Sequence, residues 1–251
     1  MRFCVPIPCF FKNSTFEEAI RTISSLGFDA AETYAWPKES PEEIRRILDA
    51  YGVELLSMCT TDFRLTDATY RLDWLDGMKR SAELAQKLGV HRLITQPGPD
   101  IGIDRARQRE NLKRTLALAA PYLESAGVTM MLEPLNARFD HKDCFMASSE
   151  EAFSVVKEIN SPGVRVIYDI YHQQITEGNI IPTIKDNLPF ISHLHCAGHP
   201  GRHELQTGEL DYNNIFAAVD AMGYTGSCGI EYQPLMDPIE SLKEFRRLYV
   251  K

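Results

Sequence analysis

The chain has 251 residues, of which 44% are hydrophobic and 25% charged, a balance typical of a globular protein with a sizeable core. This length fits one large α/β barrel better than two ordinary domains, so we predict a single domain over residues 1–251. The formal net charge of −8 argues against a nucleic-acid-binding surface and against acidic partners.

The first residues, MRFCVPIPCFFK, are apolar only briefly and are interrupted by Pro6 and Pro8. We predict a first strand here and no signal peptide, because no small-residue cleavage pattern follows. Since no later segment approaches the length of a membrane span, we expect a cytoplasmic protein without a membrane partner. The six cysteines form no CxxC pair, which indicates reduced core residues and not a disulfide framework.

The first half of the chain alternates short β-rich runs with helical stretches. Strands are predicted for FCVPI, FDAAETY, VELLSMC and VHRLITQ. Helices are predicted at 15–26, from Pro41 after a cap at Ser40, at 70–88 before Gly89, and over about twenty residues before Gly127. Thr15 and Glu18 have the spacing of a capping box, which supports the first of these helices.

The second half repeats the pattern. Strands are predicted for VTMMLEP, VRVIYDI, ISHLHCA and SCGIEYQ, and helices near 149–159, 180–187, 213–222 and from Pro238. Eight evenly spaced units of this kind predict a closed (β/α)8 barrel of the TIM type, with an open doubly wound sheet as the alternative.

Four acidic or imidazole side chains each end a predicted strand. They are Glu133 after VTMML, Asp169 after VRVIY, His195 after PFISHL and Glu231 after SCGI. Because the strands of a parallel barrel end on the same rim, we expect these side chains to converge on one divalent cation. Three carboxylates and one imidazole suit Mn²⁺ or Mg²⁺ better than structural zinc, and Mn²⁺ is our first choice. Taken singly, each has an alternative role as a helix cap or a core histidine.

Three further side chains are predicted to contact a substrate. His172 follows Asp169 by three residues beyond a strand end, although an exposed loop histidine is an equally good interpretation of this spacing. Arg202 and Glu204 lie in the polar, glycine-containing run HLHCAGHPGRHELQTGELDY, whose composition indicates a functional loop. The guanidinium of Arg202 offers a bidentate fork to a carboxylate or polyol oxygen, and its alternative is a surface ion pair.

The segments LEPLN, YDIYHQQITEGN, HLHCAGHPGRHELQTGELDY and GIEYQP resemble the hydroxypyruvate isomerase branch of the xylose isomerase-like sugar isomerase and epimerase barrels. This resemblance implies that the four strand-end residues bind one divalent metal and that Glu133 and Glu231 also exchange protons with the substrate. It places His172 and Arg202 where such barrels contact substrate oxygens. The sequence departs from that branch at His195, where hydroxypyruvate isomerases carry Gln and ketose 3-epimerases carry His. The loop TTDFRLTDATYR is also shorter than usual.

We therefore predict a metal-dependent isomerase that interconverts a small hydroxy-aldehyde and hydroxy-ketone, hydroxypyruvate-like or a short sugar acid, through an enediolate. One divalent ion is expected, with Mg²⁺, Co²⁺ and Zn²⁺ open besides Mn²⁺. A ketose 3-epimerase is the close alternative, followed by a sugar-type dehydratase and a non-catalytic barrel. A DNA-repair endonuclease is disfavoured by the acidic charge. A homo-oligomer is left open.

Overall fold

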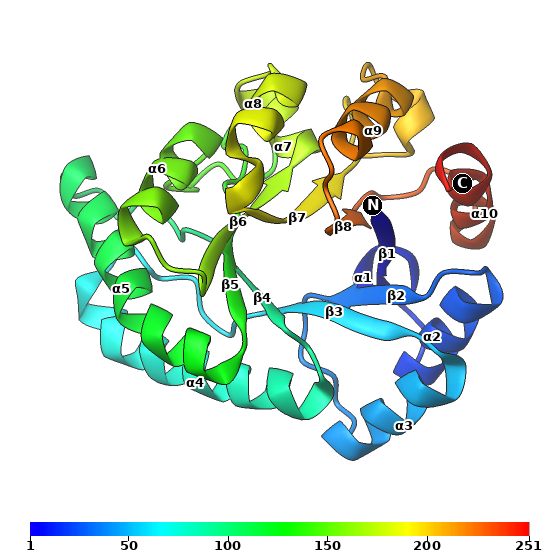
Figure 1. Ribbon diagram of the computed structural model, residues 1–251, viewed down its shortest axis with the longest axis horizontal. Coiled ribbons are helices and arrows are strands. Elements are labelled where there is room, and N and C mark those ends of the chain that lie inside the picture. Colours follow the sequence, from blue (N-terminus) through cyan, green and yellow to red (C-terminus); the bar gives the residue numbers. More distant parts are fainter. Residues whose placement is uncertain (251) are drawn as a thin grey trace.

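The computed structural model describes residues 1–250, and its strands close one parallel barrel in sequence order, with β8 hydrogen-bonded back to β1. Figure 1 shows the strands in the middle and the helices around them. The strands are β1 (Arg2–Pro6), β2 (Ala30–Thr33), β3 (Glu54–Cys59), β4 (Arg92–Thr95), β5 (Thr129–Leu132), β6 (Val164–Asp169), β7 (Ile191–Cys196) and β8 (Ser227–Ile230). The predicted (β/α)8 fold is confirmed.

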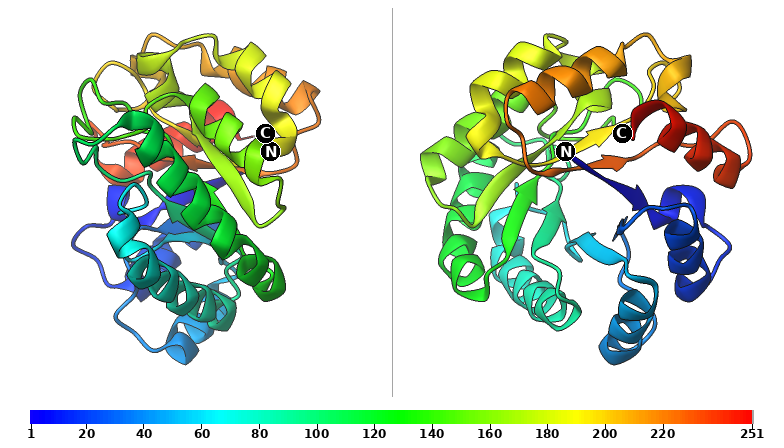
Figure 2. Two further views of the ribbon diagram at one scale, coloured as in Figure 1. Left: turned by 90° about the vertical axis from the view of Figure 1, so that its left-hand side faces the viewer. Right: turned by 45° about the vertical axis from the view of Figure 1, so that its right-hand side comes forward.

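The helices surround the barrel, as the two views of Figure 2 show. They are α1 (Ile7–Phe10), α2 (Phe16–Ser25), α3 (Pro41–Tyr51), α4 (Arg71–Leu88), α5 (Arg105–Ala126), α6 (Ser149–Ile159), α7 (Ile170–Thr176), α8 (Ile180–Asn187), α9 (Tyr212–Ala221) and α10 (Pro238–Tyr249). Short 3-10 helices are η1 (Ala68–Tyr70), η2 (Leu188–Phe190) and η3 (Leu205–Thr207). Within residues 1–250, no helix is both long and apolar enough to cross a membrane.

The helix ends follow the local signals of the sequence. Thr15 and Glu18 form the predicted capping box at the start of α2, and Ser40 accepts a hydrogen bond from the backbone of Glu43 at the start of α3. Helices α4 and α5 end at Gly89 and Gly127, whose φ values of 71° and 66° lie in the left-handed region that favours glycine. The predicted boundaries of the helices therefore agree closely with the structure, but α1 and α7 were not predicted.

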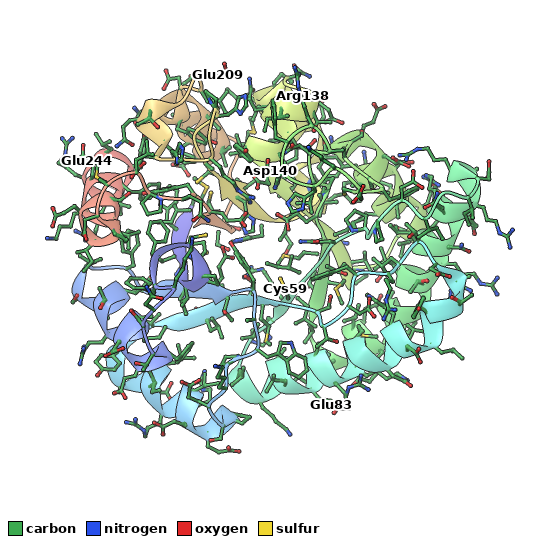
Figure 3. The ribbon with its side chains drawn as sticks, turned by 180° about the vertical axis from the view of Figure 1, so that it is seen from behind. Cys59, Glu83, Arg138, Asp140, Glu209 and Glu244 are labelled. Atoms are coloured by element: carbon green, nitrogen blue, oxygen red, sulfur yellow. The ribbon has the colours of Figure 1, made fainter. Side chains whose placement is uncertain are left out.

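The barrel interior combines apolar and polar layers. A small apolar cluster of Cys59, Ile94, Met131 and Ile167 lies inside the ring of strands, separate from the larger core between strands and helices. Figure 3 shows Cys59 near the middle of the barrel, whereas Glu83 lies on the outer helix α4. All six cysteines are free, as predicted. Polar side chains also lie inside the barrel, in two sets of possible metal ligands: one of Cys4, Glu32 and His193, and one of Glu133, Asp169, His195 and Glu231.

Candidate active site

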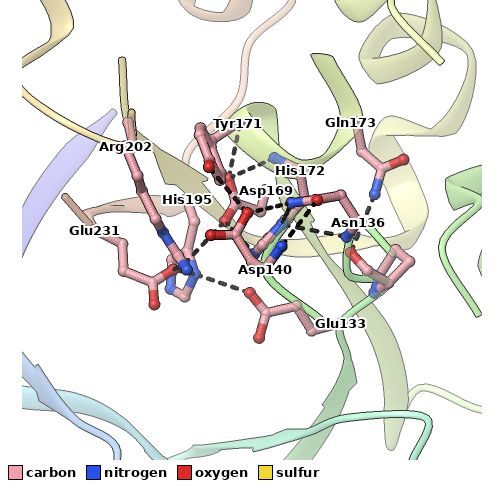
Figure 4. A network of polar contacts seen from close by, with 12 residues as sticks. Glu133, Asn136, Asp140, Asp169, Tyr171, His172, Gln173, His195, Arg202 and Glu231 are labelled. Carbon is pink, nitrogen blue, oxygen red and sulfur yellow. Dashed lines mark hydrogen bonds and ion pairs between the residues drawn. The ribbon is translucent and has the colours of Figure 1, made fainter. Parts of the chain in front are cut away.

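Four neighbouring strands carry the residues of the candidate site to the carboxyl end of the barrel. Glu133 follows β5, Asp169 ends β6, His195 lies in β7 and Glu231 follows β8. One ligand atom from each of these side chains lies within 4.8 Å of the others. Figure 4 shows Glu133 and Glu231 on either side of His195. The structure thus brings together the four residues that the sequence singled out.

The imidazole of His195 lies between the two glutamates. Its Nδ1 atom is 3.2 Å from Oε1 of Glu133 and 3.0 Å from Oε2 of Glu231. Nη2 of Arg202 is 2.9 Å from the same oxygen of Glu231 and 3.9 Å from Oδ2 of Asp169. Two positively charged groups therefore stand among three carboxylates.

The two carboxylate oxygens of Asp169 have different environments. Its Oδ1 atom caps α7 by accepting hydrogen bonds from the backbone N–H groups of Tyr171 and His172. Its Oδ2 atom is buried, accepts no hydrogen bond and lies near Arg202. One oxygen is thus fixed by the helix end, and the other remains available to a ligand.

The protonation properties of the site follow from burial and crowding. Burial and the nearby charge of Glu231 raise the pKa of Asp169 to about 7. Burial alone would also raise the pKa of Glu231, but Arg202 and His195 hold it well below its ordinary value. Burial opposes the imidazolium of His195, yet the charges of Glu32 and Glu231 raise its pKa well above the usual range.

This donor set fits a divalent cation. Buried carboxylates need a compensating positive charge, and the oxygen of Asp169 that faces the others has no hydrogen bond to satisfy it. Three carboxylates with one imidazole suit Mn²⁺, Mg²⁺ and related ions. Asp169 and His195 keep only 1% of their side-chain surface exposed, whereas Glu133 and Glu231 keep 7% and 13%. The two glutamates are therefore the members of the set that a small substrate can reach.

His172 lies fully buried beside this set, so it is not an exposed loop residue. Its Nδ1 atom faces Nδ2 of Asn136 at 2.7 Å, and the backbone N–H of Asn136 is 3.3 Å away. Since Nδ1 accepts these hydrogen bonds, the ring proton resides on Nε2. Nε2 has no hydrogen-bond partner and lies 3.5 Å from Oδ2 of Asp169. Burial and the charge of Arg202 lower the pKa of His172, which makes it a neutral donor.

Arg202 belongs to the loop between β7 and α9 and reaches back to the strand ends. Its backbone has a φ of 59°, and its carbonyl accepts a hydrogen bond from the N–H of Gln233 at 2.7 Å. The guanidinium carbon lies 5.2 Å from the ring centre of Tyr171, a cation–π distance. The loop is thus connected by a hydrogen bond to the segment after β8. Arg202 is mostly buried, so its contacts with Glu231 and Asp169 are not an ordinary surface ion pair.

Comparison with known proteins identifies the family. A 2-oxo-tetronate isomerase from Cupriavidus necator is 30% identical over 243 residues, which cover 93% of this chain and 93% of that protein. The sequence family described as the xylose isomerase-like TIM barrel matches residues 20–248. The chain belongs to this family.

Other members of the xylose isomerase-like family agree with this assignment. The hydroxypyruvate isomerase of Escherichia coli is 28% identical over 163 residues, 64% of this chain and 63% of that protein. A crystal structure described as an AP endonuclease, family 2, from Brucella melitensis has a TM-score of 0.93 and 27% identity, covering 98% of both chains. The chain is thus an enzyme of the isomerase type, as these relatives by sequence are.

Glu204 has a different environment from the one predicted. It is 1% exposed, and its carboxylate accepts hydrogen bonds from the backbone N–H groups of Leu235 and Met236 and from the hydroxyl of Ser241. These contacts satisfy both oxygens, so they give Glu204 a structural function between the β7–α9 loop and the start of α10. The prediction that Glu204 binds substrate finds no support here, because a carboxylate occupied in this way is not free for a ligand.

Two polar residues near the site, Glu32 in β2 and Tyr34 directly after it, were not predicted from the sequence. The hydroxyl of Tyr34 is buried and has no hydrogen-bond partner, and burial together with the charge of Glu231 raises its pKa well above the usual value. Glu32 lies fully buried behind His195. The available signal was the run FDAAETY, in which a carboxylate and a tyrosine end a strand as Glu133 and Asp169 do.

Proposed function

We propose that this member of the xylose isomerase-like family is a divalent-metal-dependent isomerase acting on a short sugar acid such as hydroxypyruvate or 2-oxo-tetronate. The observation that carries the proposal is the unequal exposure of the set: Glu133 and Glu231 are reachable, whereas Asp169 and His195 are closed off. Acid–base catalysis requires two groups that touch the substrate, and we assign these roles to Glu133 and Glu231.

Glu133, Asp169, His195 and Glu231 would hold the cation, with Mn²⁺ as the favoured ion and Mg²⁺, Co²⁺ or Zn²⁺ as alternatives. When bound, such an ion supplies Lewis-acid stabilisation of negative charge on neighbouring substrate oxygens. Arg202 stands beside Glu231 and Asp169, and its guanidinium, which has several N–H donors, would also donate to a substrate oxygen.

The proton transfers are assigned to the two glutamates. One removes a proton from the hydroxyl-bearing carbon next to the carbonyl group, and the other, across His195, delivers a proton to the former carbonyl carbon of the enediolate. The hydroxyl proton passes to the former carbonyl oxygen, and exchange with solvent returns both glutamates to their starting protonation states. Positioned groups of this kind each contribute roughly 10² to 10⁴ in rate. The Nε2–H group of His172 and the guanidinium of Arg202 would donate hydrogen bonds to substrate oxygens that gain negative charge.

Turnover in D₂O tests the proposal. We expect purified protein supplied with Mn²⁺ to convert hydroxypyruvate or 2-oxo-tetronate to the isomer while solvent deuterium enters at the carbon that exchanges its proton. Chelation should abolish both events. Equal turnover after complete removal of divalent ions would overturn the proposed mechanism.

A ketose 3-epimerase is the second candidate, because His195 stands where hydroxypyruvate isomerases carry Gln. Free ketoses assayed beside the two sugar acids separate these functions, since an epimerase inverts one carbon and leaves the carbonyl in place. A nuclease function is opposed by the net charge of −8, which gives no footprint for a phosphate backbone. The cytoplasmic location of the protein stays a prediction, and the formation of a homo-oligomer stays open.

A further inference from the structure

A buried polar group lies behind His195, on the side away from the candidate metal ligands. Glu32 of β2 is its centre and is fully buried. Oε2 of Glu32 accepts a hydrogen bond from the hydroxyl of Ser57 at 2.8 Å and lies 3.1 Å from Nε2 of His193. Nδ1 of His193 in turn lies 2.8 Å from the hydroxyl of Ser227. The proposed reaction uses none of these four side chains.

His195 links this group to the candidate metal centre. Its Nε2 atom lies 3.2 Å from Oε1 and 3.4 Å from Oε2 of Glu32, while Nδ1 faces Glu133 and Glu231. A histidine that binds a cation through one ring nitrogen must carry its proton on the other. The structure leaves one solution: Nδ1 binds the cation and Nε2–H donates to Glu32.

We propose that Glu32 is a positioning residue of the metal centre, which holds His195 in the Nε2–H tautomer and fixes its ring so that Nδ1 points at the cation. The inference deepens the proposed function, since it needs a cation at that centre but no particular substrate. A carboxylate behind a ligand histidine also makes the imidazole a stronger donor to the ion.

The contact between Glu32 and His195 depends on the residues packed around it. Gly229 of β8 stands beside His195 in the strand register. A Cβ atom at Gly229 would lie 2.1 Å from Oε1 of Glu32 and 2.8 Å from Cδ2 of His195. Only glycine therefore leaves room for the carboxylate to reach the imidazole. On the other side, the register of β2 shifts between Ala31 and Glu32, an irregularity that can redirect a side chain.

A second cation bound by Cys4, Glu32 and His193 is the rival interpretation, because donor atoms of these residues also lie within 4.8 Å of one another. The hydrogen bonds oppose it. Oε2 of Glu32 already accepts hydrogen bonds from Ser57 and His193, and Oε1, which has no hydrogen-bond partner, lies 3.2 Å from Nε2 of His195. Burial also raises the pKa of the Cys4 thiol well above its usual value, which keeps the sulfur protonated and a poor ligand.

Titration of the metal-free protein with Mn²⁺ alone tests the proposal, with affinity and stoichiometry read by calorimetry. We expect one ion per chain and, for Glu32→Gln, an affinity about 10- to 100-fold lower. Gly229→Ala should weaken binding to a similar degree, although it removes no functional group. Ser227→Ala is the matched control: it disturbs the same buried group but leaves the contact between Glu32 and His195, so its affinity should match the wild type.

A double-mutant cycle separates positioning from general damage. If Glu32 acts through His195, then Glu32→Gln should have no further effect on Mn²⁺ affinity in a His195→Gln background. Unchanged affinity in Glu32→Gln, or an equal loss in both backgrounds, would overturn the proposal. So would a second bound ion that is lost in Cys4→Ser. Because no substrate is used, an absence of isomerase activity together with the expected binding pattern would refute the proposed function and leave this inference standing.

Discussion

Nη2 of Arg202 lies 2.9 Å from Oε2 of Glu231, one of the two glutamates proposed as acid and base. Although burial favours the protonated acid, this guanidinium and His195 keep the pKa of Glu231 well below its ordinary value, and the group is therefore held as a base. Arg202 thus has two expected functions: it sets the protonation state of Glu231 and, with a cation present, it donates to the substrate.

Replacement of Arg202 by Gln should lower kcat/KM by about 10- to 100-fold, the value of one hydrogen bond between charged groups. The acidic limb of the pH profile of kcat/KM should also move to higher pH, because Glu231 loses a neighbouring positive charge. Steady-state kinetics across pH measure both effects. Arg109→Gln, which removes an outer-surface arginine paired with Glu158, is the matched control and should change neither. A profile unmoved by Arg202→Gln would contradict the first function.

Replacement of either exchanging glutamate should remove turnover almost completely. Glu133→Gln and Glu231→Gln keep the size of the side chain but cannot accept the proton, so each should lose at least the roughly 10² to 10⁴ contributed by a positioned base. The deuterium content of recovered substrate distinguishes the two: the variant that retains the first base still exchanges its proton with D₂O. Glu209→Gln, on the exposed part of the β7–α9 loop, is the control. Wild-type turnover in either site variant would contradict the mechanism.

The four strand-end residues could be predicted because the ends of parallel strands share one rim, whatever the sequence between them. The roles of Glu204 and Glu32 could not. Glu204 lies in a loop, and no periodicity tells which way a loop side chain turns. Glu32 lies inside the barrel, and its contact with His195 depends on the absence of a side chain at Gly229. Such a contact between distant strands has no local signal.

Helix α7 illustrates a second limit of the sequence. Asp169 is both the last residue of β6 and the cap of α7, so no glycine, proline or polar linker separates strand from helix. The residues that usually separate a strand from a helix are absent, so the sequence of this segment resembles a strand followed by a loop. The helix matters for function, because it buries His172 beside the candidate ligands.

The metal-free protein should lose stability as the pH rises above about 7. Burial raises the folded-state pKa of Asp169 from 3.8 to about 7, and neighbouring carboxylates raise that of His195 well above 6.5. At these two groups the folded state therefore binds more protons than the unfolded chain, and each lowers the unfolding free energy by up to about 1.4 kcal/mol per pH unit as the pH rises. Asp169 contributes as pH rises from its unfolded pKa toward about 7, and His195 contributes above 6.5.

Denaturant unfolding from about pH 5.5 to about pH 8.5 measures this pH dependence. Below about pH 7, His141, His172 and His193 oppose the fall, because their folded-state pKa values are lowered and they bind more protons in the unfolded chain. The depressed pKa values of Glu32 and Glu231 do not affect it, since both groups are ionised in both states over this range. Bound cation displaces the protons, so loading should remove the slope, and Mn²⁺ affinity should rise with pH. Comparison of the wild type with Asp169→Asn below about pH 7 isolates the contribution of Asp169: relative to the wild type, the variant should gain stability as the pH rises. A metal-free wild-type curve that rises with pH above about 7 would contradict the assignment.

Glu204 should matter for stability and not for metal binding. Its carboxylate accepts hydrogen bonds from Leu235, Met236 and Ser241, so Glu204→Gln weakens charge-assisted contacts and places an amide N–H₂ group against backbone donors. We expect a loss of about 1–3 kcal/mol in unfolding free energy, with Mn²⁺ affinity close to the wild type. Urea unfolding measures the unfolding free energy, and calorimetry measures the Mn²⁺ affinity. A variant as stable as the wild type but with raised KM would restore the original prediction of substrate binding.

Tyr34 offers a test in which stability and activity move in opposite directions. Its hydroxyl is buried without a hydrogen-bond partner and close enough to Glu231 for that charge to raise its pKa. A buried unpartnered hydroxyl destabilises a protein, so Tyr34→Phe should raise the unfolding free energy of the metal-free protein, by roughly 1 kcal/mol or more. If substrate supplies the missing partner, the same change should lower kcat/KM by about 2- to 10-fold, with Mn²⁺ affinity unchanged. Tyr122→Phe, on the outer helix α5, is the control. Wild-type kinetics of Tyr34→Phe on every sugar acid and ketose would mean that this hydroxyl does not contact the substrate. Hydrogen bonds to the substrate would then come from the side of His172 and Arg202 alone.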